Sequence, residues 1–349
     1  MGRPALRGSA LVVVSAAGFG LMPIFARYAY SAGVNVPTLL LLRFALAAAL
    51  LFGYLAARRR LPRPGGARQL GALVLLGGVL YATQSLLYFS AVRHISPALA
   101  VLLLYLYPAF VLLLSSAVGR HRPPLAGVGA IALSLVGMAL VVGRPTAALS
   151  LVGVLYAVGA AVVYAVYIVV GDRGSAGLPP LGTSAFVALF AGTSFALAGT
   201  GTGALRFDFA ASAWLPVLGV AAVSTVVAIG AFFAGMRVIG PTRASIMSMV
   251  EPVVSIVAAW LLLRESMTPT QVLGGAVVLA GAVWGVAGAR DRTTATGSGT
   301  PRQAGPPLDG AGGAAGQSAA PRTTKPSPSG TSSSMQNSAS ERDTTRSRR

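Results

Sequence analysis

The sequence predicts an all-α polytopic membrane protein with ten transmembrane helices, arranged as two inverted five-helix repeats. The first observation is composition: 54% of the 349 residues are hydrophobic and only 10% are charged, which is typical of membrane proteins. Second, ten apolar segments each approach the ~20 residues that cross the ~30 Å hydrocarbon core of a bilayer. Third, one sequence pattern occurs twice, 144 residues apart.

The repeated pattern is Arg-x-Ile-x-Pro, followed by ten residues and a second Pro. Its members are Arg93, Ile95, Pro97 and Pro108, then Arg237, Ile239, Pro241 and Pro252. The same offset also pairs Phe89 with Phe233 and Arg120 with Arg264. Internal repeats of this kind are typical of secondary transporters. We therefore expect one five-helix repeat over 9–143 and a second over 150–288.

The ten segments follow one another with short connections. They are expected at 9–28, 36–57, 69–91, 96–118, 124–143, 150–171, 180–199, 212–235, 240–263 and 269–288. Helices are predicted because lipid offers no water to unpaired backbone groups, and no alternating barrel pattern is present. The first segment resembles a signal peptide. However, Ile24 matches Ile168 at the repeat offset, so the segment is expected to belong to the first repeat.

Positive charge predicts the orientation of the helices. Five is an odd number, so the second repeat enters the membrane in the orientation opposite to the first. Arginines are concentrated in the even-numbered connections, namely Arg58, Arg59, Arg60, Arg63, Arg68, Arg120, Arg122, Arg173 and Arg237. Positive connections favour the cytoplasmic side, which predicts that both termini are cytoplasmic in a multi-pass protein of the bacterial plasma membrane.

The net charge of +19 does not indicate a nucleic-acid partner. Residues 1–288 carry 18 Arg and four acids, and the arginines lie between apolar runs, where lipid headgroups and topology account for them. The remaining stretch, 289–349, is rich in Ser, Gly and Pro, basic and short of apolar surface, so we expect a disordered tail. The chain has no cysteine and no acidic cluster near its two histidines. No metal site and no cofactor are therefore expected.

Glu251 is the only acid inside a predicted membrane helix. A carboxylate at the bilayer centre costs ~2.5–3.5 kcal/mol on insertion scales, and such residues usually face a cavity or the bundle interior. Burial favours the neutral form, which suits proton coupling and the binding of a cationic group. The structural alternative is an ion pair or a protonated hydrogen bond between helices. Tyr107 occupies the position that matches Glu251 in the first repeat.

Arg43 is the second charged candidate, in the first half of its segment. It could bind an anionic group of a substrate, pair with Glu251, or extend its side chain to the lipid headgroups. Polar and aromatic candidates for a cavity wall are Tyr81, Gln84, Tyr88, Tyr105, Tyr107, Tyr164, Tyr167 and Ser248. The alternative for tyrosines near helix ends is the interfacial belt. Helix kinks are predicted at Pro23, Pro108 and Pro252.

Four segments resemble helices of the EamA-type transporters of the drug/metabolite transporter superfamily. They are "GFGLMPIFARYA" at 18–29, "LLRFALAAALL" at 41–51, "RHISPALAVLLLYLYP" at 93–108 and "RVIGPTRASIMSMVEP" at 237–252. Where the family commonly has Trp, this chain has Phe19 or Gly20. The resemblance covers about 9–288, and it implies ten helices in two inverted repeats around a central cavity for small solutes.

The predicted function is secondary active transport of a small organic solute across the bilayer by alternating access. Export of an amino acid, metabolite or drug-like compound is expected, coupled to protons through Glu251. The alternatives are exchange of a nucleotide sugar or another anionic metabolite, a polytopic membrane enzyme, and a scaffold. No GxxxxGK[ST] motif is present to bind ATP, and the helices contain no paired carboxylates or Ser/His/Asp set for enzyme chemistry. The sequence carries no signal for an oligomeric state.

Overall fold

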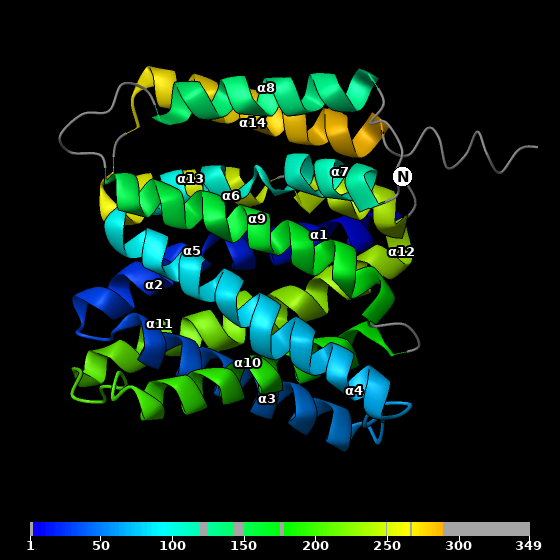
Figure 1. The fold of residues 1–349 in the computed structure, drawn as a ribbon, viewed down its shortest axis with the longest axis vertical. Coiled ribbons are helices and arrows are strands. Elements are labelled where there is room, and N and C mark those ends of the chain that lie inside the picture. The colour runs from blue at the N-terminus through cyan, green and yellow to red at the C-terminus, as the bar shows by residue number, and fades with distance from the viewer. Residues whose placement is uncertain are drawn as a thin grey trace, which may run out of the picture. The chain divides into compact units, whose positions relative to one another are not determined.

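The computed structural model describes residues 3–118, 125–142, 150–174, 178–248, 250–265 and 267–288, and all regular structure in these ranges is helical (Figure 1). Within these ranges, seven helical stretches are long and apolar enough to cross a membrane, and two shorter apolar helices follow at Glu251–Leu263 and Pro269–Gly281. These helices fit a polytopic membrane protein. The predicted tail, 289–349, lies outside the described residues.

Several predicted spans are built from more than one helical piece. In chain order the elements are α1 (Arg3–Gly20), α2 (Met22–Ser31), α3 (Val36–Ala57), α4 (Ala67–Val74), η1 (Leu75–Tyr81), α5 (Ala82–His94), α6 (Pro97–Leu104), α7 (Tyr107–Val118), α8 (Leu125–Val142), α9 (Leu151–Gly174), α10 (Pro180–Gly201), η2 (Ala211–Ala213), α11 (Trp214–Leu218), η3 (Gly219–Val227), α12 (Ala228–Ser248), α13 (Glu251–Leu263) and α14 (Pro269–Gly288). The elements η1 and η3 are π-helical, η2 is a 3₁₀ turn, and α12 contains a break at Gly240 with φ of 82°.

The helix boundaries recur at the 144-residue offset of the sequence repeat. Helices α3 and α10 each contain 22 residues, and their first residues are 144 positions apart. The two π-helices begin at Leu75 and Gly219, with the same separation. Helices α7 and α13 also begin 144 residues apart, at Tyr107 and Glu251. The repeat is thus present in the local backbone as well as in the sequence.

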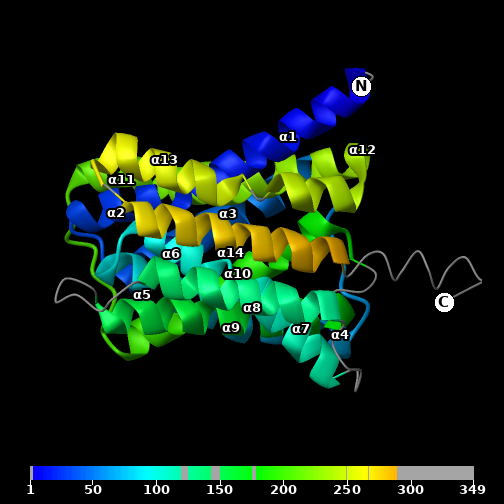
Figure 2. The ribbon, with the colours of Figure 1, turned by 90° about the horizontal axis from the view of Figure 1, so that it is seen from above.

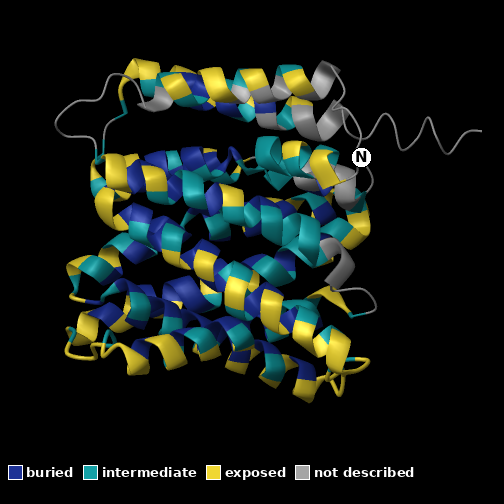
Figure 3. Ribbon diagram, viewed as in Figure 1, coloured by how far each residue is buried: buried dark blue, intermediate teal, exposed yellow. Residues whose placement is uncertain are grey.

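Counterpart helices of the two halves pack against each other. Helix α3 lies along α10 at one edge of the bundle, and α8 lies along α14 at the other edge (Figures 1 and 2). Between these pairs, α1 packs along α12 and α5 packs along α9. The exposed residues lie mainly on the outer faces of the helices (Figure 3), and they include Leu215 and Leu197, which are 80% and 70% exposed. Apolar outer faces suit contact with lipid.

The three prolines singled out in the sequence each stand at the start of a helix after a break. Pro23 is the second residue of α2, Pro108 of α7 and Pro252 of α13. Proline is tolerated there because it has no N–H to donate to the preceding turn. The break between α1 and α2 leaves the Gly20 carbonyl free, and the Ser255 hydroxyl of α13 donates a hydrogen bond to it at 2.6 Å.

Glycine allows the π-helix η1 to approach α10 closely. A Cβ on Gly77 would lie 2.7 Å from the Val187 carbonyl oxygen, and that oxygen belongs to the backbone and cannot rotate away. On the next residue, the Gly78 carbonyl accepts a hydrogen bond from the Ser194 hydroxyl at 2.8 Å. Small residues at such crossings bring membrane helices into van der Waals contact.

Replacing Gly77 with Ala is expected to destabilise this crossing by about 1–3 kcal/mol, the usual cost of overpacking. The control is Gly53→Ala in α3, where an added Cβ meets no atom within 4 Å. The control should be neutral or slightly stabilising, because Ala favours helix over Gly by ~1 kcal/mol. Thermal unfolding in detergent measures both variants. Equal melting temperatures would contradict the proposed close contact.

Candidate functional site

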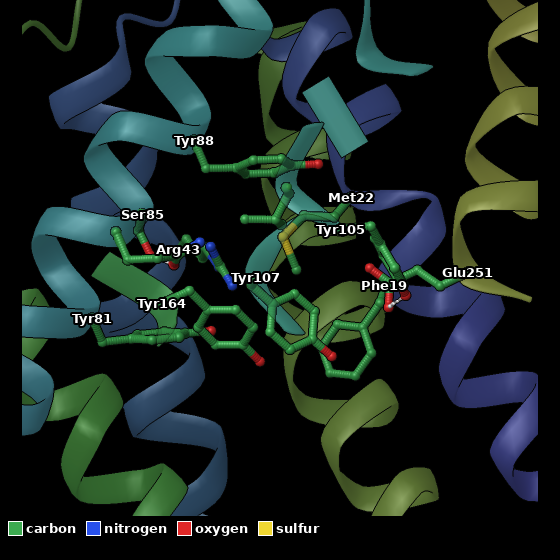
Figure 4. A pocket seen from close by; sticks show the side chains of 12 residues that line it. Phe19, Met22, Arg43, Tyr81, Ser85, Tyr88, Tyr105, Tyr107, Tyr164 and Glu251 are labelled. Carbon is green, nitrogen blue, oxygen red and sulfur yellow. Dashed lines mark hydrogen bonds between the residues drawn. The ribbon is translucent and has the colours of Figure 1, made fainter. Parts of the chain in front are cut away.

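A cavity lies in the centre of the bundle and has two adjoining chambers. The inner chamber has a volume of about 140 Å³ and is lined by Phe19, Met22, Arg43, Tyr81, Gln84, Ser85, Tyr88, Leu104, Tyr105, Tyr107, Tyr164 and Glu251 (Figure 4). The outer chamber has a volume of about 460 Å³ and is lined by Phe19, Phe44, Tyr81, Tyr105, Tyr107, Tyr164, Tyr167, Ser184, Val187, Ala188, Thr225, Ile229, Phe232, Phe233, Ser248 and Glu251. The shared lining residues, among them Tyr107 and Glu251, join the two chambers.

The end of the bundle where α1 begins is here called the N-terminal side (Figure 1). Ser184 is the fifth residue of α10, which starts on this side. Tyr167 lies in the last third of α9, which ends on this side. The inner chamber lies against the first half of α3 and the first half of α5.

Side chains of α2 close the opposite side of the bundle by bonding to backbone carbonyls. The Tyr30 hydroxyl donates to the Phe89 oxygen at 3.0 Å, and Arg27 Nη1 donates to the Val92 oxygen at 3.2 Å. The Tyr28 hydroxyl donates to the Leu262 oxygen of α13 at 2.8 Å. Together with the buried apolar core around Leu39 and Leu40, these bonds hold the helices of this side together.

Glu251 is the first residue of α13 and faces both chambers. The Tyr105 hydroxyl donates to its Oε2 at 3.2 Å and also lies 3.4 Å from the Ser248 carbonyl oxygen. A helix N-terminus carries partial positive charge from its unpaired N–H groups, which favours an anion at this position. The break before α13 therefore creates a polar position inside the membrane-spanning bundle that can hold either a carboxylate or its protonated form.

Arg43 lies on the wall of the inner chamber and is only 2% exposed. Its Nε donates to the Thr225 hydroxyl at 3.1 Å, and its guanidinium carbon lies 4.7 Å from the Phe44 ring centre and 5.1 Å from the Phe89 ring centre. The described neighbours that act electrostatically on its guanidinium are tyrosines, which are neutral near pH 7, with no carboxylate among them. Arg43 therefore neither extends to the headgroups nor forms an ion pair with Glu251 in this conformation.

Aromatic rings connect the two charged residues around the cavity wall. Phe44 contacts Tyr81 edge-on at 5.7 Å, and Tyr81 contacts Tyr167 at 5.2 Å. The series continues from Tyr167 to Tyr164 at 6.0 Å, to Tyr107 at 4.8 Å and to Tyr105 at 5.9 Å. In the view of Figure 4 the Tyr107 and Tyr164 rings lie between Arg43 and Glu251. Such a wall suits an amphipathic or aromatic solute.

The structure brings the candidate residues of the sequence together at this cavity. Arg43, Gln84 and Tyr88 line the inner chamber only, and Tyr167 and Ser248 line the outer chamber only. The candidates that line both chambers are Tyr81, Tyr105, Tyr107, Tyr164 and Glu251, and Phe19 lines both as well. Among the residues that the sequence did not single out, Thr225 is the most consequential, because it bonds to Arg43.

The repeat offset could have identified several of the missed residues. Thr225 is 144 positions after Tyr81, and Phe232 is 144 positions after Tyr88. The same relation connects Arg43 to Val187, Ser85 to Ile229 and Leu104 to Ser248. In each pair the first member lines the inner chamber and the second lines the outer chamber. The two chambers are therefore built in part from equivalent positions of the two halves. The inner chamber is small and polar, and the outer one is larger and mainly apolar.

Two relatives match most of the chain. An uncharacterized transporter of Archaeoglobus fulgidus is 29% identical over 287 residues, which cover 78% of this chain and 94% of that protein. The uncharacterized transporter YcbK of Bacillus subtilis is 27% identical over 285 residues, covering 78% of this chain and 90% of the relative.

A solved crystal structure of another protein is similar in fold, with a TM-score of 0.56 and 21% sequence identity over 82% of this chain and 98% of that chain. The model of the EamA-like transporter family matches twice, at residues 6–143 and 151–286, and so accounts for most of the sequence. The chain therefore belongs to the EamA-like transporter family and carries two tandem copies of the family's unit.

Proposed function

We propose that this transporter exports a small organic solute by alternating access and couples export to proton entry through Glu251. The observation that carries the proposal is the position of Glu251 at the start of α13, facing a cavity with an aromatic wall. The proposed location is the bacterial plasma membrane with both termini cytoplasmic, so the described conformation faces the cytoplasm. The solute class comprises amino acids, metabolites and drug-like compounds of similar size.

The proposed architecture has ten transmembrane helices in two inverted repeats, 9–143 and 150–288, around the cavity. Helix boundaries that recur after 144 residues support it, as do the counterpart pairs α3 with α10 and α8 with α14. The tandem family match divides the chain in a similar place, between residues 143 and 151.

Competition between a proton and the solute at Glu251 gives the coupling. An ionised carboxylate binds a cationic or hydrogen-donating group of the solute, whereas protonation removes the charge and favours release. The Tyr105 hydroxyl, 3.2 Å from Oε2, holds the carboxyl group toward the cavity. Release toward the opposite side requires the hydrogen bonds of Arg27, Tyr28 and Tyr30 to break while the N-terminal side closes.

One observation favours a second function, exchange of anionic metabolites. Arg43 is a buried cation that no described carboxylate neutralises, and it faces the inner chamber. An anionic solute would supply the missing charge, since an unpaired buried ion is costly. In an exchanger, solute on the far side of the membrane would increase the rate of transport, and a pH gradient would not change it.

Replacing Glu251 with Gln is expected to abolish solute accumulation driven by a pH gradient in proteoliposomes, because Gln cannot release a proton. The solute is taken from a thermal-shift screen of amino acids, aromatic carboxylates and amphipathic amines. A melting temperature in detergent equal to that of the wild type should show that the variant is folded. The control is Glu265→Gln, which alters a glutamate beyond the end of α13. Burial raises the pKa of the Glu265 carboxyl, and nearby Arg27 partly opposes this shift.

A gradient-driven accumulation by Glu251→Gln equal to that of the wild type would refute coupling through this residue. Loss of accumulation in both glutamate variants would mean that the effect is not specific to the cavity. Gradient-insensitive exchange in the wild type would favour the exchanger instead.

Cysteine labelling is expected to reach the outer chamber from the cytoplasmic side only. The natural chain has no cysteine, so single substitutions need no altered background. Ser248→Cys lines the outer chamber, and the exposed Ser31→Cys lies at the opposite end of the bundle. A membrane-impermeant thiosulfonate should modify Ser248→Cys in inside-out vesicles and Ser31→Cys in right-side-out vesicles. The reverse pattern would mean that the termini are outside.

A further inference from the structure

Thr225 holds an unusual position between the two halves of the molecule. It is 3% exposed, lines the outer chamber and lies in the π-helix η3. Its hydroxyl donates to the Val220 carbonyl oxygen, five residues earlier, at 2.8 Å. The Thr225 hydroxyl oxygen in turn accepts a hydrogen bond from Arg43 Nε at 3.1 Å, across 182 residues of sequence.

The two hydrogen bonds of the Thr225 hydroxyl bear on which N–H groups of Arg43 are left for other partners. A hydroxyl has one hydrogen to donate, and here Val220 takes it, so the oxygen lone pairs are directed to the guanidinium. Because Thr225 occupies Nε, the remaining N–H groups of Arg43 are those of the two terminal nitrogens. Tyr81, which lines both chambers, interacts with the guanidinium as well.

The end of a guanidinium is a suitable partner for a carboxylate. Its two terminal nitrogens can donate a pair of parallel hydrogen bonds to the two carboxylate oxygens. Arg43 lines the inner chamber, and the described groups that act on its charge are Tyr81, Tyr88 and Tyr30. The inner chamber thus offers an anion-binding end opposite the acid, Glu251, in the same lining.

We propose that Thr225 is a positioning residue that directs the end of the Arg43 guanidinium into the inner chamber and thereby selects solutes that carry a carboxylate. Since it acts through Arg43, this role depends on the proposed function of the cavity. Arg43 and Thr225 come from opposite repeats, and Tyr81 is the counterpart of Thr225 at the 144-residue offset. The anion-binding end is therefore assembled from both repeats and would change its geometry when the repeats move.

Benzoate and benzamide are matched probes for this proposal, because they share a ring and differ in the carboxylate. The full-length protein in lipid nanodiscs is titrated with each probe by calorimetry. Thr225→Val keeps the shape of the side chain but removes its hydroxyl, and Thr225→Ser restores the hydroxyl. The control is Thr193→Val in α10, an exposed threonine whose hydroxyl bonds only within its own helix.

The expected result is a Kd for benzoate about tenfold higher in Thr225→Val, in the range of one hydrogen bond to a charged group. Benzamide affinity should be unchanged, Thr225→Ser should restore benzoate binding, and Thr193→Val should bind both probes like the wild type. Arg43→Gln should lose selective benzoate binding. In that background Thr225→Val should have no further effect, because its action depends on the guanidinium.

Three kinds of outcome would overturn the proposal, and they differ in whether the anion site at Arg43 is still supported. If Arg43→Gln loses benzoate binding while Thr225→Val retains it, Thr225 has no positioning role but Arg43 remains the anion site. If Arg43→Gln binds benzoate like the wild type, or the wild type does not bind it, the anion site itself is absent. If Thr225→Val weakens both probes equally, or weakens benzoate further in Arg43→Gln, the effect of Thr225 is not exerted through Arg43.

Discussion

Backbone groups inside a bilayer must be hydrogen-bonded within the protein, and this constraint decides where the helices can be interrupted. Three interruptions occur around the same cavity, at Leu21, before Tyr107 and before Glu251. At the first, the Ser255 hydroxyl satisfies the Gly20 carbonyl. At the third, the free helix N-terminus lies beside a carboxyl group. The breaks are tolerated because the protein encloses them, and they create the polar positions that a solute site requires.

The two chambers differ although they are built from equivalent positions. Tyr88 and Ser85 line the small inner chamber, whereas their counterparts Phe232 and Ile229 line the larger outer one. The hydrogen bonds of α2 close the bundle beyond the inner chamber. In an alternating transporter, the first repeat would adopt the packing that the second has here, and the second would adopt that of the first. This exchange would open the side of the bundle where α2 now forms its hydrogen bonds. The charged groups have no counterpart of the same charge, because Val187 is the counterpart of Arg43 and Tyr107 is the counterpart of Glu251. In the proposed mechanism, the basic and acidic ends of the cavity would therefore keep their identities in both conformations.

The cost of polar groups in lipid explains why much of the site was predictable. An acid, an arginine and several tyrosines within apolar segments are unfavourable unless they face one another or a cavity, and the structure brings them to one cavity. Thr225 was not predictable in this way, because threonine satisfies its hydroxyl within its own helix at little cost, as Thr193 does. Its contact with Arg43 depends on how α3 packs against η3, which no local pattern encodes.

The sequence by itself determined the membrane class, the doubled unit, the proline interruptions and the identity of the acid within the predicted membrane segments. These features follow from composition, spacing and the local chemistry of single residues. Only the tertiary structure decided which partners the charged groups have. Arg43 bonds to Thr225 rather than to Glu251, and Glu251 bonds to Tyr105. The physical reason is that a hydrogen bond requires atoms within about 3 Å, and residues separated by 182 positions reach that distance only when whole helices pack.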